Sequence, residues 1–383
     1  MGREKRSALT SGVREMSLAG ETMSVQRLAP AEQGAGLRAR RAVALWLLAI
    51  AAMIGVMVVL GGATRVSGSG LSIMEWAPLS GALPPLSNAE WRRLFALYQQ
   101  IPQYHLLHEG MDLAGFKSIF WLEWVHRLWG RLMAVAFFVP LLVFWARGRL
   151  SRRLAARLVG IFLLGGLQGA VGWFMVASGF FPESEAVAPL RLVIHLGLAL
   201  TLYAAVLWTA LSELFPVPSG QPTGLVSLCA RLTLALVALT ILAGGFVAGN
   251  HAGLDYNTFP LMDGHWVPVG YARLSPLWRN FGENIAAVQF DHRLLATLSL
   301  LAALVTFAAG GQRWRQLSAP PRRALIFLAT SILLQFALGV TTLLLIVPAP
   351  LAVLHQAGAV LLLTAAIFTV YVWPPTTAQK DMS

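Results

Sequence analysis

Residues 43–61 read VALWLLAIAAMIGVMVVLG, an apolar run without a charged side chain. A helix of about 20 such residues is long enough to cross the hydrocarbon core of a bilayer. Seven further runs of this kind follow, at 125–146, 156–178, 190–211, 225–249, 285–309, 323–346 and 349–373. Of all residues 57% are hydrophobic and 12% are charged, and the charged share is about half that of soluble domains. The sequence therefore predicts an all-α integral membrane protein with eight transmembrane helices.

The net charge of +12 is explained by clusters of arginine on alternate connections. The connections between these clusters carry few basic residues for their length, and the one at 179–190 carries two glutamates. By the positive-inside rule this asymmetry places both termini in the cytoplasm. The basic residues thus indicate membrane topology and not a nucleic-acid surface. The clusters are Arg38, Arg40 and Arg41; Arg147, Arg149, Arg152 and Arg153; and Arg313, Arg315, Arg322 and Arg323.

The first 42 residues hold no apolar core and are therefore not a secretory signal. Their four glutamates also argue against a mitochondrial presequence, which is poor in acidic residues. We predict a disordered cytoplasmic tail at 1–42 and a second tail at 374–383 of a bacterial inner-membrane protein. The single cysteine, Cys229, has no partner for a disulfide or a cysteine metal cluster, and is interpreted as a packing residue.

The chain repeats itself, with one sequence match in each of four successive helices. Such a repeat predicts two pseudo-symmetric four-helix bundles, 43–215 and 225–373, that enter the membrane from the same side. Their boundary lies in the connection Pro216–Gly224, and the long connections 62–123 and 250–284 are predicted to cap a site. The matches are Gly61-Gly62 to Gly70-Leu71 with Gly244-Gly245 to Gly253-Leu254; His126-Arg127 with His292-Arg293; Gln168 and Gly172 with Gln335 and Gly339; and Ala188-Pro189-Leu190 to His195 with Ala349-Pro350-Leu351 to His355.

Four of the eight histidines, His126, His195, His292 and His355, lie inside the apolar runs. We predict that each falls within about two turns of the extracytoplasmic end of its helix, so that all four share one depth. Polar groups within a membrane usually mark function, and helix bundles build cofactor sites from side chains on facing helices. The pattern predicts two sites, each with one histidine from each of two helices.

A site of two histidines without cysteine is poor for zinc, which requires four ligands. Haem supplies four ligands itself and leaves two axial positions, which suits a histidine pair. Arg127, Arg131 and Arg293 follow the histidines closely and could pair with the haem propionates. They could equally anchor helix ends at the membrane interface, and both interpretations stay open.

The two halves differ at one position beside the histidines. Glu123 precedes His126 by three residues and Gln289 precedes His292 by three, so each shares a helix face with its histidine. A carboxylate could take a proton or stabilise a cation on a substrate, which an amide does poorly. It could also simply orient His126. On this asymmetry the first half is the reactive site, and the second is a structural or electron-transfer site.

Together these motifs resemble the haem A synthase family over residues 43–373. The residues that carry the resemblance are Gly61-Gly62, Thr64-Arg65, Ser69-Gly70-Leu71-Ser72, Trp76, Pro78, Phe116-Lys117, Glu123-x-x-His126-Arg127, Gly130-Arg131, Asn257-Thr258-Phe259-Pro260, Gln289-Phe290-x-His292-Arg293 and His355-Gln356. Some members carry a cysteine pair in the first extracytoplasmic loop. This chain has none there and resembles the cysteine-free class, which leaves the route of electrons open.

The resemblance implies oxidation of the C8 methyl group of haem O to the formyl group of haem A, through two successive hydroxylations and loss of water. It implies a haem b cofactor ligated by His292 and His355, and a substrate haem addressed by His126 and His195 with Glu123 nearby. It further implies a haem O-producing farnesyltransferase and terminal oxidase assembly factors as partners, besides membrane lipid, and leaves homo-oligomerisation open. No role is assigned to His251.

Two other functions fit a membrane protein with two haem sites. One is a di-haem b-type cytochrome that passes electrons without altering either haem, and the other is a haem transporter. Glu123 and the long outer loops favour the enzyme, because an electron carrier requires neither. Fixed ligation by two histidines would slow release, which disfavours a transporter.

Overall fold

The computed structural model describes residues 30–78, 80–182, 186–215 and 224–373. Within these ranges the chain is helical apart from loops and one isolated β-bridge between Met262 and His265. Eight of the described helices are long and apolar enough to cross a membrane, which confirms the predicted all-α, eight-span class. These are α2 (Pro30–Val66), α5 (Leu113–Ala146), α6 (Arg152–Val176), α7 (Pro189–Leu214), α8 (Gly224–Gly249), α10 (Ile285–Gly311), α11 (Ala319–Leu344) and α12 (Ala349–Val372).

The predicted start of the second span at residue 125 was wrong, because α5 begins at Leu113. The Asp112 side chain caps this helix by accepting a hydrogen bond of 2.8 Å from the backbone N–H of Gly115. In the added turns Phe116 and Phe120 are buried against loop helices. The sequence of these turns lacks the continuous apolar run that marks a span. The predicted loop 62–123 accordingly contains helices of its own, which are η1 (Ser80–Ala82), α3 (Asn88–Tyr98) and α4 (Pro102–Leu107).

The predicted disordered tail 1–42 falls mostly outside the described residues. Its described part is helical, because α2 begins at Pro30, and the prediction was wrong there. This stretch is rich in alanine and arginine, which favour helix. The predicted tail 374–383 and the connection 216–223 lie outside the described residues. The chain divides after Arg40, and the second unit, Arg41–Ser383, carries all the histidines.

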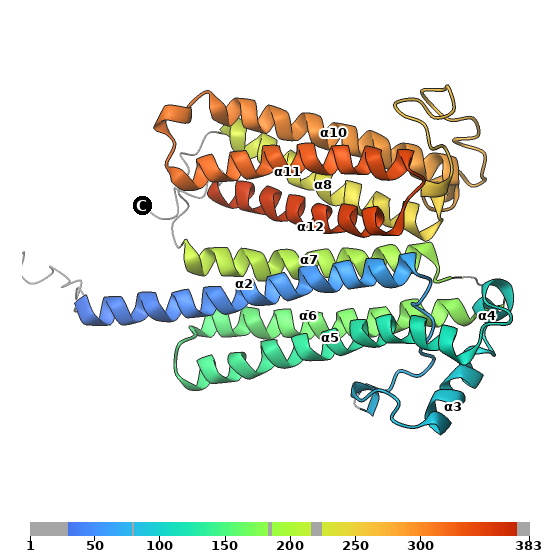
Figure 1. Cartoon of the computed structure of the whole chain (residues 1–383). Helices are drawn as coiled ribbons and strands as arrows, with labels where there is room; N and C mark the ends of the chain where they lie inside the picture. Colours follow the sequence, from blue (N-terminus) through green and yellow to red (C-terminus); the bar gives the residue numbers. More distant parts are fainter. Residues whose placement is uncertain (1–29, 79, 183–185, 216–223, 374–383) are drawn as a thin grey trace, which may run out of the picture. The chain divides into compact units, whose positions relative to one another are not determined.

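Within this second unit the helices form two sets of four (Figure 1). In the first set α5 packs on α6 and α6 on α7, with α2 contacting α5. In the second set α8 packs on α10, α10 on α11, and α11 on α12. The sets meet where α7 packs on both α8 and α12, and within the second set α12 also packs on α8. The limits 43–215 and 225–373 for two domains stay a prediction.

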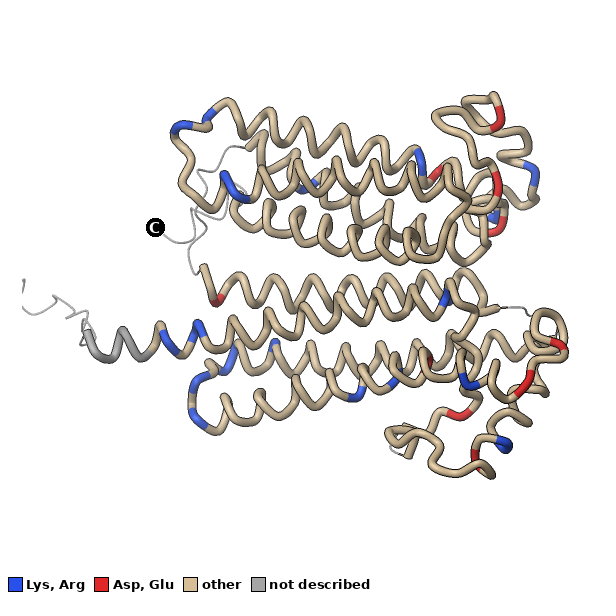
Figure 2. Tube along the Cα trace, viewed as in Figure 1, with Lys and Arg blue, Asp and Glu red and all other residues tan. Residues whose placement is uncertain are grey.

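The arginine-rich connections α5–α6 and α10–α11 lie at the opposite end of this unit from the long loops (Figure 1). Figure 2 shows arginines at the short connections α5–α6 and α10–α11, and acidic residues mainly at the other end. That other end, here called the loop end, carries residues 67–112 and 250–284. The latter segment contains η3 (Ala252–Leu254), η4 (Leu277–Arg279) and α9 (Asn280–Glu283). The remaining short elements are η2 (Ala177–Phe180) and η5 (Trp314–Gln316).

The two helix sets contact one another through corresponding glycines. A methyl group on Gly62 of α2 would lie 1.8 Å from Gln356 Oε1 of α12, and the Gln356 amide donates a 2.7 Å hydrogen bond to the Val58 carbonyl. A methyl group on Gly245 of α8 would lie 3.1 Å from Leu196 Cδ2 of α7. Gln356 and Leu196 each directly follow one of the four histidines within spans, so each set packs against the other beside its own histidine.

The first loop segment has its own apolar core, in which Tyr98 is fully buried. The Tyr98 hydroxyl lies 2.5 Å from Nδ1 of His108 and 3.1 Å from Oε1 of Gln103. The Gln103 amide in turn donates to the Gly68 carbonyl at 3.2 Å. This short chain of hydrogen bonds connects the loop core to the end of α2.

Acid is expected to loosen this loop core. Burial lowers the pKa of His108 below its ordinary value, so the fold favours the neutral imidazole. Its contribution to stability is present above the ordinary histidine pKa and is lost as the pH falls through that range. The measurement is hydrogen–deuterium exchange of peptide 98–108, taken as the ratio of the wild-type rate to the rate in a His108→Gln variant at the same pH. This ratio should be higher at about pH 5.5 than at about pH 7.5. An unchanged ratio at both values would contradict the expectation.

Candidate functional site

The first pair of histidines comes from α5 and α7. His126 lies on α5 and His195 on α7, close enough for their imidazoles to interact electrostatically. A methyl group on Gly61 of α2 would lie 3.4 Å from His126 Nε2. One on Gly172 of α6 would lie 2.8 Å from His195 Cε1. All four helices of the set therefore contribute, two by a histidine and two by a glycine that leaves room for the ring.

The second pair is built in the same way. His292 lies on α10 and His355 on α12, again within electrostatic range of one another. A methyl group on Gly244 of α8 would lie 3.1 Å from His292 Cε1, and one on Gly339 of α11 would lie 2.8 Å from His355 Cε1. The two sets of four helices thus repeat the whole arrangement and not only the histidines.

The predicted depth of the histidines needs one correction. His195, His292 and His355 lie within two turns of the start of their helices, as expected. His126 lies more than three turns into α5, because that helix extends beyond the predicted span. It is nevertheless placed opposite Gly61 as His292 is placed opposite Gly244.

Hydrogen bonds orient three of the four rings. Nδ1 of His292 donates to the Thr240 carbonyl at 3.0 Å, which leaves Nε2 with its lone pair. The Gln335 amide lies 3.1 Å from Nδ1 of His355 and donates to the His355 carbonyl at 2.9 Å. Gln168 lies 3.3 Å from Nε2, and not from Nδ1, of His195 and donates to the His195 carbonyl at 3.1 Å.

No role of Gln168 or Gln335 was predicted from the sequence. The signal was present as the repeated Gln-x-x-x-Gly pattern, because a spacing of four places both side chains on one helix face. Gln168 with Gly172, and Gln335 with Gly339, form the surface against which one histidine of each pair rests.

The donor set fits a group that brings most of its own ligands. Among the described residues no three histidine, cysteine or carboxylate side chains lie together as a metal site. The two histidines of each half could supply two nitrogens to a group that brings four ligands of its own. Nδ1 of His195 is buried and has no hydrogen-bond partner among the described residues. Haem matches this donor set in both halves.

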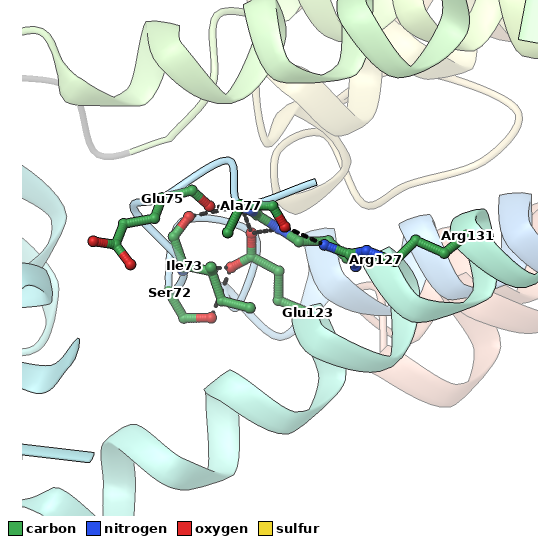
Figure 3. Close-up of polar contacts among 7 residues, drawn as sticks. All are labelled: Ser72, Ile73, Glu75, Ala77, Glu123, Arg127 and Arg131. Carbon is green, nitrogen blue, oxygen red and sulfur yellow. Dashed lines mark hydrogen bonds and ion pairs between the residues drawn. The ribbon is translucent and has the colours of Figure 1, made fainter. Parts of the chain in front are cut away.

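Glu123 holds a segment that we call the first strap, residues 69–78, against α5 (Figure 3). Its Oε2 accepts hydrogen bonds from the Ser72 hydroxyl at 2.7 Å and from the Ile73 backbone N–H at 2.9 Å. Its Oε1 accepts from Nε and Nη2 of Arg127 at 3.0 and 2.5 Å. Among the described residues Glu123 therefore bonds to the strap and to Arg127, and not to His126.

Gln289 plays the corresponding part for the second strap, residues 252–261. Its amide nitrogen donates to the carbonyls of Ala252 and Asp255 at 2.6 and 2.5 Å. Its Oε1 accepts a 2.7 Å hydrogen bond from Nη2 of Arg293. Gln289 and Glu123 are both nearly fully buried, with 2% and 3% of their surface exposed.

The three predicted arginines also bind the straps. Arg127 donates to the carbonyls of Ile73 and Glu75 at 2.6 and 2.8 Å. Arg131 donates to the carbonyls of Ala77 and Pro78, both at 2.9 Å.

Arg293 repeats the contacts of Arg127 in the second half. It donates to the carbonyls of Tyr256 and, at 2.8 Å, Thr258. Nη1 of Arg131 and Nε of Arg293 remain buried without a partner among the described residues.

Each strap runs from the helix that carries one histidine of a pair to the helix whose glycine lies against the second histidine of that pair. Trp76 of the first strap stacks on Trp173 of α6, with ring centroids 5.9 Å apart. Phe259 of the second strap contacts Phe336 of α11 edge-on at 6.2 Å. Trp173 follows Gly172, and Phe336 precedes Gly339 by one turn. Each strap therefore lies at the loop end of one histidine pair.

The other four histidines lie in the loop segments. His265 forms part of the β-bridge to Met262. His251 has a left-handed backbone with φ of 55°, and its Nε2 lies 2.7 Å from Nη2 of Arg65. Arg65 also donates to the Ala248 carbonyl at 2.9 Å, which ties the end of α2 to the end of α8. His105 and His108 lie at α4.

The fold and the candidate site define an eight-helix membrane protein with two histidine pairs, each with a strap at the loop end. Comparison with known proteins agrees. The chain belongs to the cytochrome oxidase assembly protein family COX15-CtaA, whose model matches residues 44–367.

Curated relatives cover most of the chain. A protein of Granulibacter bethesdensis named "Heme A synthase" is 59% identical over 87% of this chain and 88% of its own length. One of the same name from Rhodospirillum centenum is 47% identical over 89% of this chain and 91% of its own length. A third, from Nitrosospira multiformis, is 48% identical over 86% and 92% respectively.

Proposed function

We propose that this chain is a haem A synthase, an oxidoreductase that converts the C8 methyl group of haem O to a formyl group through two successive hydroxylations and loss of water. The observation that carries the proposal is that one chain holds two histidine pairs, each set among four helices with glycines against its rings. The names of the relatives support the same activity.

In the first half, His126 and His195 would hold the substrate haem. Gly61 and Gly172 leave space beside the two rings. The free Nη1 of Arg131 is placed to bind a propionate of the substrate. The first strap, with Trp76 on Trp173, would exclude water from the loop end of the site.

In the second half, His292 and His355 would ligate a resident haem b. That group would supply a one-electron redox centre. Thr240 and Gln335 orient the two imidazoles, and the free Nε of Arg293 is placed for a propionate. Gln289 fixes the second strap beside this pair.

We further propose that the protein lies in a bacterial inner membrane with both termini in the cytoplasm. The arginines at the short connections support this topology (Figure 2), and it places both straps outside. A farnesyltransferase that makes haem O would supply the substrate, and terminal oxidase assembly factors would receive the product. Association into homo-oligomers belongs to the same proposal.

The test is production of haem A in a membrane that lacks it. The chain would be expressed in bacteria that make haems B and O only, and the haems would be separated by chromatography with mass detection. Haem A or its hydroxymethyl precursor should appear with the wild type and be lost with His195→Ala, because substrate ligation needs both histidines. Recovery of only unmodified haem from well-expressed protein with ample haem O would instead favour a di-haem electron carrier.

A further inference from the structure

The two straps present opposite hydrogen-bonding groups to corresponding positions of α5 and α10. The groups that face Glu123 are donors, namely the hydroxyl of Ser72 and the backbone N–H of Ile73. The groups that face Gln289 are acceptors, namely the backbone carbonyls of Ala252 and Asp255. Because both side chains are almost completely buried, water cannot compensate for a mismatched contact.

An arginine one turn further along the helix faces each side chain from the other side. A guanidinium group only donates hydrogen bonds. Glu123 therefore meets donors on both sides, from the strap and from Arg127, and only a carboxylate can accept on both. Gln289 meets the donor Arg293 on one side and two carbonyls on the other, which an amide satisfies and a carboxylate does not.

We propose that the Glu123/Gln289 difference is set by the hydrogen-bond polarity of the straps. Glu123 is then a positioning residue, which holds the first strap and Arg127 beside His126, and it is not the proton carrier of the reaction. To accept a proton it would have to give up a bond from Ser72, Ile73 or Arg127. This corrects the interpretation of the asymmetry as reactive carboxylate against inert amide.

Release of Glu123 would loosen the strap at Ser72 and Ile73, over the first histidine pair. The rest of the strap is held by the hydrogen bonds from Arg127 and Arg131 to its carbonyls and by the ring contact between Trp76 and Trp173. It is also held by Leu71, whose Cδ1 would lie 2.5 Å from a methyl group on Gly179. A loosened strap would hold haem O less well while the histidines stay in place. Only this last consequence rests on the proposed function, because the hydrogen bonds belong to the chain alone.

Hydrogen–deuterium exchange of the full-length protein in lipid nanodiscs, without haem O, tests the polarity match. Glu123→Gln is expected to speed exchange of the Ile73 amide by about tenfold or more and to leave the second strap unchanged. Gln289→Glu is expected to speed exchange in the second strap and to leave the first strap unchanged, so each variant is the control for the other. If the first strap exchanged as slowly in Glu123→Gln as in the wild type while haem O conversion was lost, the proposal would be overturned. Glu123 would then be a proton carrier.

Ser72→Ala keeps the carboxylate and removes one of its hydrogen bonds, and it covers the case in which a charge-changing variant does not fold. It is expected to speed exchange of the strap and to raise KM for haem O by about threefold, with kcat within about twofold. Plain loss of folded protein would lower the maximal rate and leave KM unchanged, which contradicts positioning. If the wild type made no haem A, the function would fail, while the exchange measurements would still decide the role of Glu123.

Discussion

Replacing His355 with alanine is expected to remove haem from the protein purified from cells that make only haem B. The haem content should fall by about tenfold or more, because one of two axial ligands is lost and changes even to groups behind a ligand cost about that much in metal affinity. His195→Ala in the first pair should keep the haem of the second half. The measurement is the haem-to-protein ratio from the absorbance of the reduced pyridine complex.

The control is built into the repeat, since His195 and His355 hold corresponding places on α7 and α12 and lean on corresponding glycines. Equal loss of haem from both variants would mean that the halves do not differ in resident haem. Loss from His195→Ala alone would reverse the assignment of resident haem and substrate.

A methyl group at Gly172 is expected to abolish most haem O conversion. In Gly172→Ala the new carbon would lie 2.8 Å from Cε1 of His195, which is closer than non-bonded carbons approach. The ring must move, and overpacking of this kind costs about 1–3 kcal/mol. We expect conversion to fall by roughly tenfold, with the resident haem retained, as measured by product analysis and by haem content.

Gly169→Ala is the matched control, because it lies on the same helix and nothing is within 4 Å of its added methyl group. Glycine to alanine in a helix otherwise favours the helix by about 1 kcal/mol. Gly169→Ala should therefore convert haem O as the wild type does. Equal losses in both variants would show that α6 tolerates no added methyl group, whether or not it meets the histidine.

The sequence was sufficient for the eight helices and for the histidine pairs, because both are written in single residues and their spacing. Apolar length predicts a span directly, and a histidine is visible wherever it stands. The start of α5 could not be found in this way, since Phe116 and Phe120 are buried by the loop core and lie outside the long apolar run.

The partners of Glu123 were equally hidden. Glu123 lies one turn before His126 on α5, as the spacing predicts. Its four hydrogen bonds, however, come from Arg127 on the same helix and from a strap some 50 positions earlier in the chain. Whether a backbone N–H or a carbonyl of the strap faces Glu123 depends on the path of the strap and cannot be read from the residue type at Ile73. The contacts of Gln168 and Gln335 could have been predicted from the sequence, because both halves have the same spacing from glutamine to glycine. Only the histidine that each glutamine faces could not be read from that spacing.

The glycines that join the two helix sets describe an isologous interface within one chain. Gly62 of the first set meets Gln356 of the second, while Gly245 of the second meets Leu196 of the first, as the same patch is used twice in a symmetric homodimer. Each set thus forms part of the wall behind the other's histidine. The molecule is in this sense two subunits on one polypeptide, and if the subunits were made separately they would have to dimerise before the helix wall beside either histidine pair was complete.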